Sequence, residues 1–229
     1  MHPLDNIIWQ ALTTRHVRFA EGSGQARRFI REVTSLAGFA EPSLEGYASL
    51  GRIVGVDGTA ALFLDERYEA RKGWDLVAEA PLLQMVSERE TAPPAPEVSP
   101  KITELGLKDS LEMVELTALT KPGPFGTRTH ELGTYLGIRQ DGGGRLMAMA
   151  GERLKVPGYT EVSAVCTHPD HTGKGYARLL MLEVMRRIRE RDETPCLHVR
   201  QDNIRAVELY ERLGFRTRVV VHLAVLRKI

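Results

Sequence analysis

The second half of the chain shows two hydrophobic periods that alternate in a regular order. Short apolar or β-rich runs predict strands, and stretches in which apolar side chains recur every three or four residues predict helices with one buried face. The predicted strands are 102–105, 134–139, 145–152, 159–167, 196–199 and 215–228, and the predicted helices are 110–119, 174–191 and 203–213. Strands that first form a meander and then alternate with helices predict an α/β fold with a mixed sheet.

The first half has a less regular pattern, which predicts helices first and strands later. Residues 50–56 and 59–64 flank Asp57-Gly58, a pair typical of tight hairpin turns. Asp141-Gly-Gly-Gly144 predicts a second hairpin, in the other half of the chain. The segments predicted as helices are 7–18 and 25–36, and those compatible with strand or helix are 74–80 and 82–86. No group of residues in this half indicates chemistry.

The clearest break in composition is Thr91-Ala-Pro-Pro-Ala-Pro-Glu-Val-Ser-Pro100, with four prolines in ten residues. Proline removes a backbone donor and restricts φ, so this stretch suits an extended linker. We therefore predict a smaller α/β domain of unknown role over 1–92, a linker over 93–100 and a larger domain over 101–229. The first part carries a net charge of −3 and the remainder +4.

Composition and charge exclude several classes of protein. The formal net charge of +1 gives no reason to expect nucleic acid or a membrane surface as a partner. The two cysteines, Cys166 and Cys196, are too few for a disulfide framework, and nothing near them has metal-ligand spacing. No apolar run approaches the length of a membrane span, and the N-terminal residues do not resemble a signal peptide. We expect a soluble cytoplasmic protein without a bound metal.

The most informative segment is Thr172-Gly-Lys-Gly-Tyr-Ala-Arg178, which joins a predicted strand to the start of a helix. Unpaired N–H groups at a helix N-terminus form an anion site, and glycines let a phosphate approach the backbone. The sequence lacks the pattern of an ATP-binding P-loop, and Arg178 stands where a dinucleotide fingerprint needs glycine. The pyrophosphate of coenzyme A and a tight turn without ligand both stay open.

Two motifs resemble the Gcn5-related N-acetyltransferases (GNAT superfamily). Residues 161–177, from Glu161 to Ala177, resemble the central motif of that superfamily, and Asn203-x-x-Ala206-x-x-Leu209-Tyr210-x-x-Leu213-Gly214-Phe215 is similar to its second motif. The resemblance covers roughly residues 100–229 and is closest to the subgroup of glycine N-acyltransferases. One departure is Thr172, where members of the superfamily usually carry Arg or Gln, and this change weakens the expected contact with coenzyme A.

The resemblance implies the GNAT fold and acetyl-CoA as the acyl donor. Strands 162–167 and 197–199 would splay apart, with the pantetheine arm between them and the pyrophosphate on the loop after the first strand. A primary amine would attack the thioester directly in a ternary complex, without an acyl-enzyme. The residues that the resemblance assigns to the donor site are Val165, Cys166, Thr167, Thr172, Gly173, Lys174, Gly175, Tyr176, Ala177, Arg178, Asn203, Ala206 and Tyr210.

Catalytic roles follow from the same resemblance. Tyr210 would protonate the departing thiolate, although helical spacing alone would make it a core tyrosine. Glu161 would be the general base, and the alternative is a carboxylate that only pairs with solvent or a nearby arginine. Asn203 is also a helix cap, and both cysteines are most simply small buried hydrophobic residues.

The acceptor amine is the part of the reaction that the residues specify least. A small molecule or a peptide is expected, and the Pro/Gly-rich loop Lys121-Pro-Gly-Pro-Phe-Gly126 stands where such domains often meet substrate. A homodimer is a further possibility. Two other interpretations stay open: an acyl-CoA sensor without catalytic activity, and a first half that is a diverged second copy of the same fold.

Overall fold

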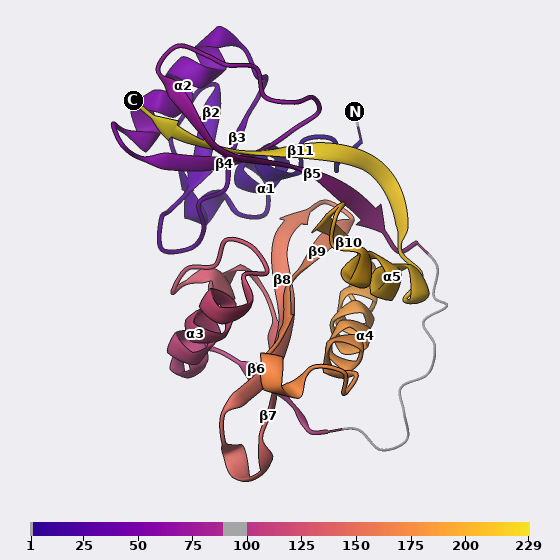
Figure 1. Cartoon of the computed structure of the whole chain (residues 1–229). Coiled ribbons are helices and arrows are strands. Elements are labelled where there is room, and N and C mark those ends of the chain that lie inside the picture. The colour runs from indigo at the N-terminus through magenta and orange to yellow at the C-terminus, as the bar shows by residue number, and fades with distance from the viewer. Residues whose placement is uncertain (1, 89–99) are drawn as a thin grey trace.

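The computed structural model of the protein describes residues 2–88 and 100–229, and its main feature is one mixed sheet (Figure 1). Eight strands form it in the order β4-β11-β5-β10-β9-β8-β7-β6. These strands are β4 (Thr59–Leu64), β5 (Trp74–Val86), β6 (Ile102–Leu105), β7 (Tyr135–Arg139), β8 (Leu146–Val156), β9 (Tyr159–Thr167), β10 (Thr194–Arg200) and β11 (Arg216–Lys228). The predicted α/β fold with a mixed sheet is therefore confirmed.

The strands of the second half form an antiparallel meander from β6 to β9, and β10 then runs parallel to β9. β5 comes from the first half of the chain, yet it lies between β10 and β11 and is antiparallel to both. β4, also from the first half, pairs with the other edge of β11. The two halves thus share one sheet, and the predicted domain boundary at residue 92 does not coincide with a break in that sheet.

Helices cover both faces of the sheet (Figure 1). α4 (Tyr176–Arg189) and α5 (Ile204–Arg212) pack on one face, in a core cluster with Met85, Leu136 and Phe215. α3 (Ser110–Thr120) lies on the opposite face, in a cluster with Tyr135 and Cys166. Burying large apolar side chains on both faces is the main source of stability in such a layered fold.

The remainder of the first half builds a second, smaller layer. A three-stranded sheet consists of β1 (Ala20–Glu21), β2 (Ala26–Phe29) and β3 (Ala37–Phe39). α1 (Ile7–Thr13) and α2 (Leu44–Val54) pack against these strands, and Phe29 and Leu50 are fully buried there. Leu36 forms an isolated bridge with Ala61 of β4, which ties the small sheet to the large one.

Most predicted elements of the second half are confirmed within two residues, apart from a longer β8. The Asp141–Gly144 turn joins β7 to β8 as predicted, with the Gln140 amide donating to the Arg145 carbonyl at 3.0 Å. In the first half, 74–80 and 82–86 form the single strand β5, which continues through Pro81.

Three predictions for the first half were wrong, and a fourth element is shorter than predicted. Residues 50–56 lie largely in α2 rather than in a strand, because Ser43 caps a helix by accepting from the Gly46 amide and Leu50 faces the core. Asp57, with φ of 59°, therefore sits in a helix-to-strand turn and not in a hairpin. Residues 25–36 form β2 and a turn instead of a helix, and the predicted helix 7–18 ends at Thr13.

Part of the predicted linker, residues 93–99, lies outside the described residues. Across 2–88 and 100–229, none of the helices has both the length and the apolar character that crossing a bilayer requires.

Candidate active site

β9 and β10 pair only at their beginnings and then separate. Parallel pairing joins Tyr159, Thr160 and Glu161 to Thr194, Pro195 and Cys196, and it ends there. β9 nevertheless continues to Thr167 and β10 to Arg200, each hydrogen-bonded to its other neighbour. The predicted splay between 162–167 and 197–199 is thereby confirmed. Backbone groups along the two facing edges are left for another partner, because main-chain donors and acceptors are obligatory hydrogen-bonding groups.

A β-bulge interrupts β9 within this splay. The register with β8 shifts between Gly151, opposite Ser163, and Met149, opposite Cys166. Ala164 lies inside the bulge with φ of 53°, a left-handed conformation that is uncommon for a residue with a Cβ. Such a bulge re-aims the backbone, and strain of this kind concentrates at functional sites.

The glycine-containing loop begins at Thr172, five residues after β9 ends at Thr167, and leads into α4. Gly173 and Gly175 have φ of 80° and 78°, and a Cβ built at either position would meet no other atom within 4 Å. From Gly173 to Ala177, the backbone N–H groups have no acceptor within the described part of the chain. The loop therefore has the open space, the donors and the helix dipole that an anionic group requires.

Side chains around this loop are arranged as follows. The Thr172 hydroxyl donates to the Pro169 carbonyl at 3.1 Å. This hydrogen bond closes the turn. The Lys174 ammonium lies 3.3 Å from Nδ1 of His171. His168 is buried, and its Nδ1 accepts from the Asp170 amide at 3.3 Å. These two histidines thus belong to the turn geometry.

Tyr210 reaches the same region from α5. Its side chain is 9% exposed, and its ring packs edge-to-face on Phe215 with the centroids 6.1 Å apart. Burial raises the pKa of Tyr210 to about 12, and the neighbouring Cys166 thiol of β9 adds to the effect. No hydrogen bond to the Tyr210 hydroxyl is formed by any of the described residues. The phenol therefore keeps its proton at neutral pH, as a proton donor must.

Asn203 caps α5, as its position predicts. Its side-chain oxygen accepts from the Ala206 amide at 3.3 Å, and both residues stand at the start of the helix that carries Tyr210. Val165, Cys166 and Thr167 form the splayed end of β9. Burial raises the pKa of Cys166 to about 11, and Cys196 is also a buried free thiol, which supports a hydrophobic role for both.

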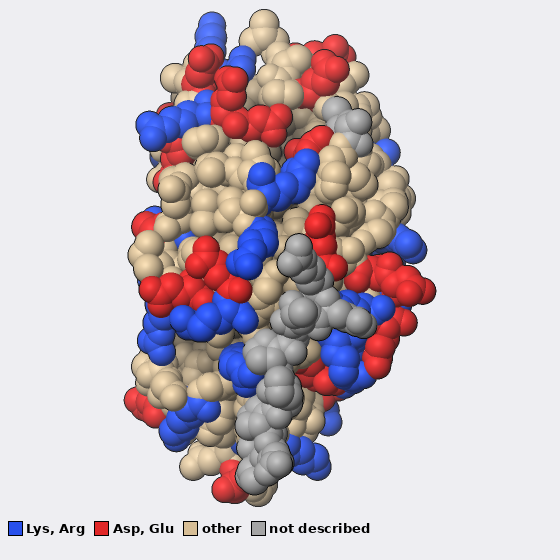
Figure 2. Space-filling model, turned by 90° about the vertical axis from the view of Figure 1, so that its right-hand side faces the viewer, with Lys and Arg blue, Asp and Glu red and all other residues tan. Residues whose placement is uncertain are grey.

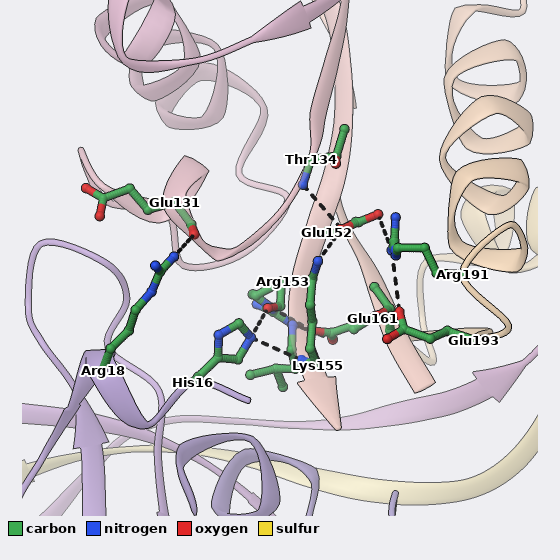
Figure 3. A network of polar contacts seen from close by, with 12 residues as sticks. His16, Arg18, Glu131, Thr134, Glu152, Arg153, Lys155, Glu161, Arg191 and Glu193 are labelled. Carbon is green, nitrogen blue, oxygen red and sulfur yellow. Dashed lines mark hydrogen bonds and ion pairs between the residues drawn. The ribbon is translucent and has the colours of Figure 1, made fainter. Parts of the chain in front are cut away.

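Glu161 occupies a different place from the one predicted for a general base. It is fully buried, and Nε and Nη2 of Arg153 donate to its two carboxylate oxygens at 2.8 and 2.7 Å (Figure 3). Nδ1 of His198 lies 2.8 Å from Oε1, and the Leu154 amide donates to Oε2 at 3.3 Å. Burial alone would raise the pKa of Glu161, but the Arg153 charge and the hydrogen bonds lower it well below its usual range. A carboxylate held in this way is a poor proton acceptor, so the structure argues against the predicted role.

The Glu161 ion pair belongs to a network that joins the two halves. His198 contacts the side-chain amide of Gln84 on β5 at 3.1 Å, and this amide also donates to the Leu4 carbonyl. Nε2 of His16 lies 2.9 Å from the Arg153 carbonyl oxygen and accepts from the Lys155 amide at 3.1 Å (Figure 3). Arg153 and His198 were not predicted from the sequence as partners of Glu161. The one indication in the sequence was that Arg153 is a charged residue next to β-rich segments.

The opposite face of the sheet is closed by the loop that follows α3. Phe125 packs edge-to-face on Tyr135 with the centroids 5.7 Å apart, and Nη1 of Arg153 lies 3.8 Å from the point where a Gly123 Cβ would stand. The Tyr135 hydroxyl is buried without a hydrogen-bond partner in the described chain. The loop is anchored to the first half, since the Arg128 amide donates to the Glu32 carbonyl at 2.9 Å.

No cluster of three or more potential metal ligands exists among residues 2–88 and 100–229. The arrangement is a phosphate-sized loop, a splayed pair of strands and a buried phenol on one side of a sheet. These parts suit a ligand that has an anionic end and an extended arm, with its reactive end next to Tyr210.

Comparison with known proteins gives the same assignment for the second half and extends it to the whole chain. Residues 135–223 match the family model described as FR47-like protein. A crystal structure from Novosphingobium aromaticivorans, assigned to the GNAT family of acetyltransferases, is 34% identical over 100% of both chains, with a TM-score of 0.89. A GCN5-related N-acetyltransferase from Kribbella flavida is 20% identical and shares the fold, with 95% of each chain covered and a TM-score of 0.62. No curated protein sequence matches the chain.

Proposed function

The chain belongs to the GNAT family of acetyltransferases, and from this premise we propose that it transfers an acetyl group from acetyl-CoA to a primary amine. The observation that supports this most directly is the position of Tyr210, which stands beside the splayed end of β9 and near an open phosphate-sized loop. The proposal includes the donor site predicted from the sequence, with a small-molecule or peptide amine as acceptor and the cytoplasm as the compartment.

The pyrophosphate of acetyl-CoA would accept hydrogen bonds from the N–H groups of Gly173 to Ala177, at the N-terminus of α4. The pantetheine arm would extend along the free edge of β9 near Val165 and pair with its backbone, as an added strand does. A main-chain N–H at the Ala164 bulge would then polarise the thioester carbonyl. Each of these contacts uses backbone groups, so the Thr172 departure removes none of them.

The reaction would be a direct displacement. The neutral amine attacks the thioester carbonyl carbon, the carbon–sulfur bond breaks, and the sulfur leaves with the bonding electron pair. Tyr210 gives its proton to this thiolate, the amine nitrogen releases one proton to water as the amide forms, and the Tyr210 phenolate regains a proton from solvent. Glu161 takes no part in proton transfer here, because Arg153 and His198 occupy its carboxylate. Its contribution is to hold β8, β9 and β10 together at the closed end of the splay.

Tyr210→Phe tests the proposal, because it removes one hydroxyl from a side chain that has no hydrogen-bond partner in the described chain. The kcat for amine acetylation is expected to fall by about 10²–10⁴-fold, with acetyl-CoA affinity by isothermal titration unchanged. Tyr159→Phe is the matched control: its hydroxyl lies 3.2 Å from His2 at the far end of β9, and its kcat should match the wild type. Equal kcat values for the two variants would contradict the acid role.

The donor site has a separate test. Gly175→Val forces a β-branched residue into a conformation with φ of 78°, so acetyl-CoA binding should be lost while the fold is retained. Unchanged binding would place the donor elsewhere. Acetyl-CoA binding that depends on Gly175, together with no transfer to any amine in a broad screen, would favour the non-catalytic sensor instead.

A further inference from the structure

A pocket separate from the proposed donor site lies between α2 of the first half and the end of β11. It has a volume of about 530 Å³, within the usual range of small-molecule sites. α2 forms one wall, the residues that lead into β5 form the second, and the end of β11 forms the third. Neither the splay nor the glycine-containing loop contributes a residue to it. The proposed acetyl transfer therefore leaves this pocket unused.

The lining of the pocket combines aromatic and basic side chains. Tyr47 and Trp74 are buried, and their rings meet edge-to-face with the centroids 6.3 Å apart. The basic residues are Arg52, Arg71, Lys72 and Lys228, and no acidic residue of the described part of the chain lines the pocket. This concentration of positive charge is unexpected, because residues 1–92 carry a net charge of −3.

The four basic side chains of the pocket lack acidic partners. Across the described residues, none of them forms an ion pair with an Asp or Glu side chain, although the Lys228 ammonium donates to the Ile229 carbonyl oxygen. Elsewhere the opposite holds: Arg186 of α4, for example, pairs with both Glu183 and Glu190. Figure 2 shows basic and acidic groups interspersed on one side of the molecule, over the surface that the described residues form. Unpaired like charges that line one pocket repel each other, and an anion bound between them would relieve this.

Two of the basic groups are held in place by the backbone and the aromatic wall. The stem of Lys228 crosses Gly51, 3.2 Å from where a Cβ would stand, and its ammonium lies 3.2 Å from the equivalent point at Gly73. The Arg71 guanidinium carbon lies 4.5 Å from the centre of the Tyr47 ring. Nε of Arg71 is buried without an acceptor in the described chain. A buried donor without an acceptor costs free energy, and a bound oxyanion would supply the missing acceptor.

We propose that this pocket binds a small polyanion, phosphorylated or polycarboxylic, whose apolar or planar part rests on Trp74 and Tyr47. Guanidinium groups bind phosphate and carboxylate through paired N–H donors, and the lysines add compact charges. The pocket is confined to three short segments in an otherwise acidic half, which favours a small ligand over the extended backbone of a nucleic acid. The site is independent of the proposed acetyl transfer.

The test titrates the full-length protein with inorganic pyrophosphate and, separately, with citrate, by isothermal titration. We expect a Kd of about 1 mM or tighter for at least one of the two anions, and the preferred anion identifies the ligand class. Arg52→Gln/Lys72→Gln removes two exposed cations of the pocket and should weaken binding at least about tenfold. Lys101→Gln/Lys108→Gln removes the same charge from exposed positions elsewhere and should leave the Kd unchanged.

Fluorescence locates the bound anion, because Trp74 lies in the pocket wall and the chain has only one other tryptophan. In a Trp9→Phe background, the anion should change the Trp74 emission. Binding that survives in the pocket variant but is lost in Gly175→Val would assign the anion to the donor loop and overturn the proposal. No binding at about 10 mM of either anion, or binding only of a DNA duplex, would also overturn it.

Discussion

Replacing Glu161 by Gln is expected to destabilise the fold, and not to act first on the chemistry. The side chains of Glu161 and Arg153 are 1% and 8% exposed, and two hydrogen bonds of 2.8 and 2.7 Å join them. Gln has the same shape but no charge, so the variant leaves the Arg153 cation buried without its counterion. His198 loses a charged acceptor at the same time.

The size of the effect follows from burial. Removing one partner of a buried ion pair costs about 3–5 kcal/mol, because the remaining charge stays desolvated. The Gln amide keeps part of the hydrogen bonding, so we expect about 3 kcal/mol in the free energy of unfolding. In a chain of 229 residues this corresponds to a Tm lower by about 6–12 °C.

Urea unfolding at pH 7, followed by circular dichroism, measures this difference. Glu104→Gln is the control, because Glu104 lies on β6 of the same sheet and also pairs with an arginine, Arg187 of α4, but is 66% exposed. It should cost about 1 kcal/mol or less. A second variant, Arg153→Met/Glu161→Leu, removes both charges and should recover much of the lost stability. A loss for Glu161→Gln no greater than that of Glu104→Gln would refute the reasoning.

The pH dependence of the free energy of unfolding distinguishes a structural ion pair at Glu161 from a general base. A carboxylate whose pKa is lower in the folded protein stabilises the fold above the unfolded pKa of about 4.3, and the gain is lost as the pH falls below that value. The stability difference between wild type and Glu161→Gln should therefore be constant from about pH 5 to 8 and shrink below about pH 4. A changed pH–rate profile at unchanged stability would instead restore Glu161 as the base.

Two further predictions concern packing and protonation at the junction of β8 with its neighbours. Gly151→Ala places a Cβ 2.3 Å from the Tyr135 ring and should lower the free energy of unfolding by about 1–3 kcal/mol, whereas Gly106→Ala, with open space around it, should be nearly neutral in the same thermal melts. Burial lowers the pKa of His16 to about 4, so the unfolded chain takes up a proton below about pH 6.5 that the folded chain does not. Wild-type stability should fall by up to about 1.4 kcal/mol per pH unit between pH 6.5 and 4, and urea unfolding of His16→Gln should lack this slope; parallel profiles would contradict it.

The parts of the site that sequence reasoning located are those with local causes. The phosphate-sized loop depends on Gly173 and Gly175 at a strand-to-helix junction, and all of its geometry lies within a few residues. The Asn203 cap is equally local. The partner of Glu161 could not be found in this way, because Arg153 reaches it only through the register of β8 and β9, which a bulge shifts. A slip of one residue would turn Arg153 to the other face.

The errors in the first half have a physical cause of the same kind. Asp57-Gly58 fits a turn in either a hairpin or a helix-to-strand connection, and the dipeptide alone does not distinguish them. Ser43 is a helix cap, and the buried residues Tyr47, Leu50 and Val54 recur at helical spacing, so the segment forms a helix. The amphipathic pattern that begins at Ser43 therefore determines the structure before Asp57-Gly58, and the turn propensity of that dipeptide does not.

The position of β5 changes how the two halves relate to the active site. β5 pairs with β10 from Leu82 to Val86, along the edge opposite the splay, and with β11 along nearly its whole length. Without it, β10 would keep only three residues of pairing with β9, and β11 would pair only with β4, which also comes from the first half. The proposed use of the free β9 edge by pantetheine requires β10 to stand apart from β9, and beyond Cys196 the strand partner of β10 is β5. The first half is therefore part of the sheet that forms the proposed donor site, and residues 101–229 alone lack a strand of that sheet.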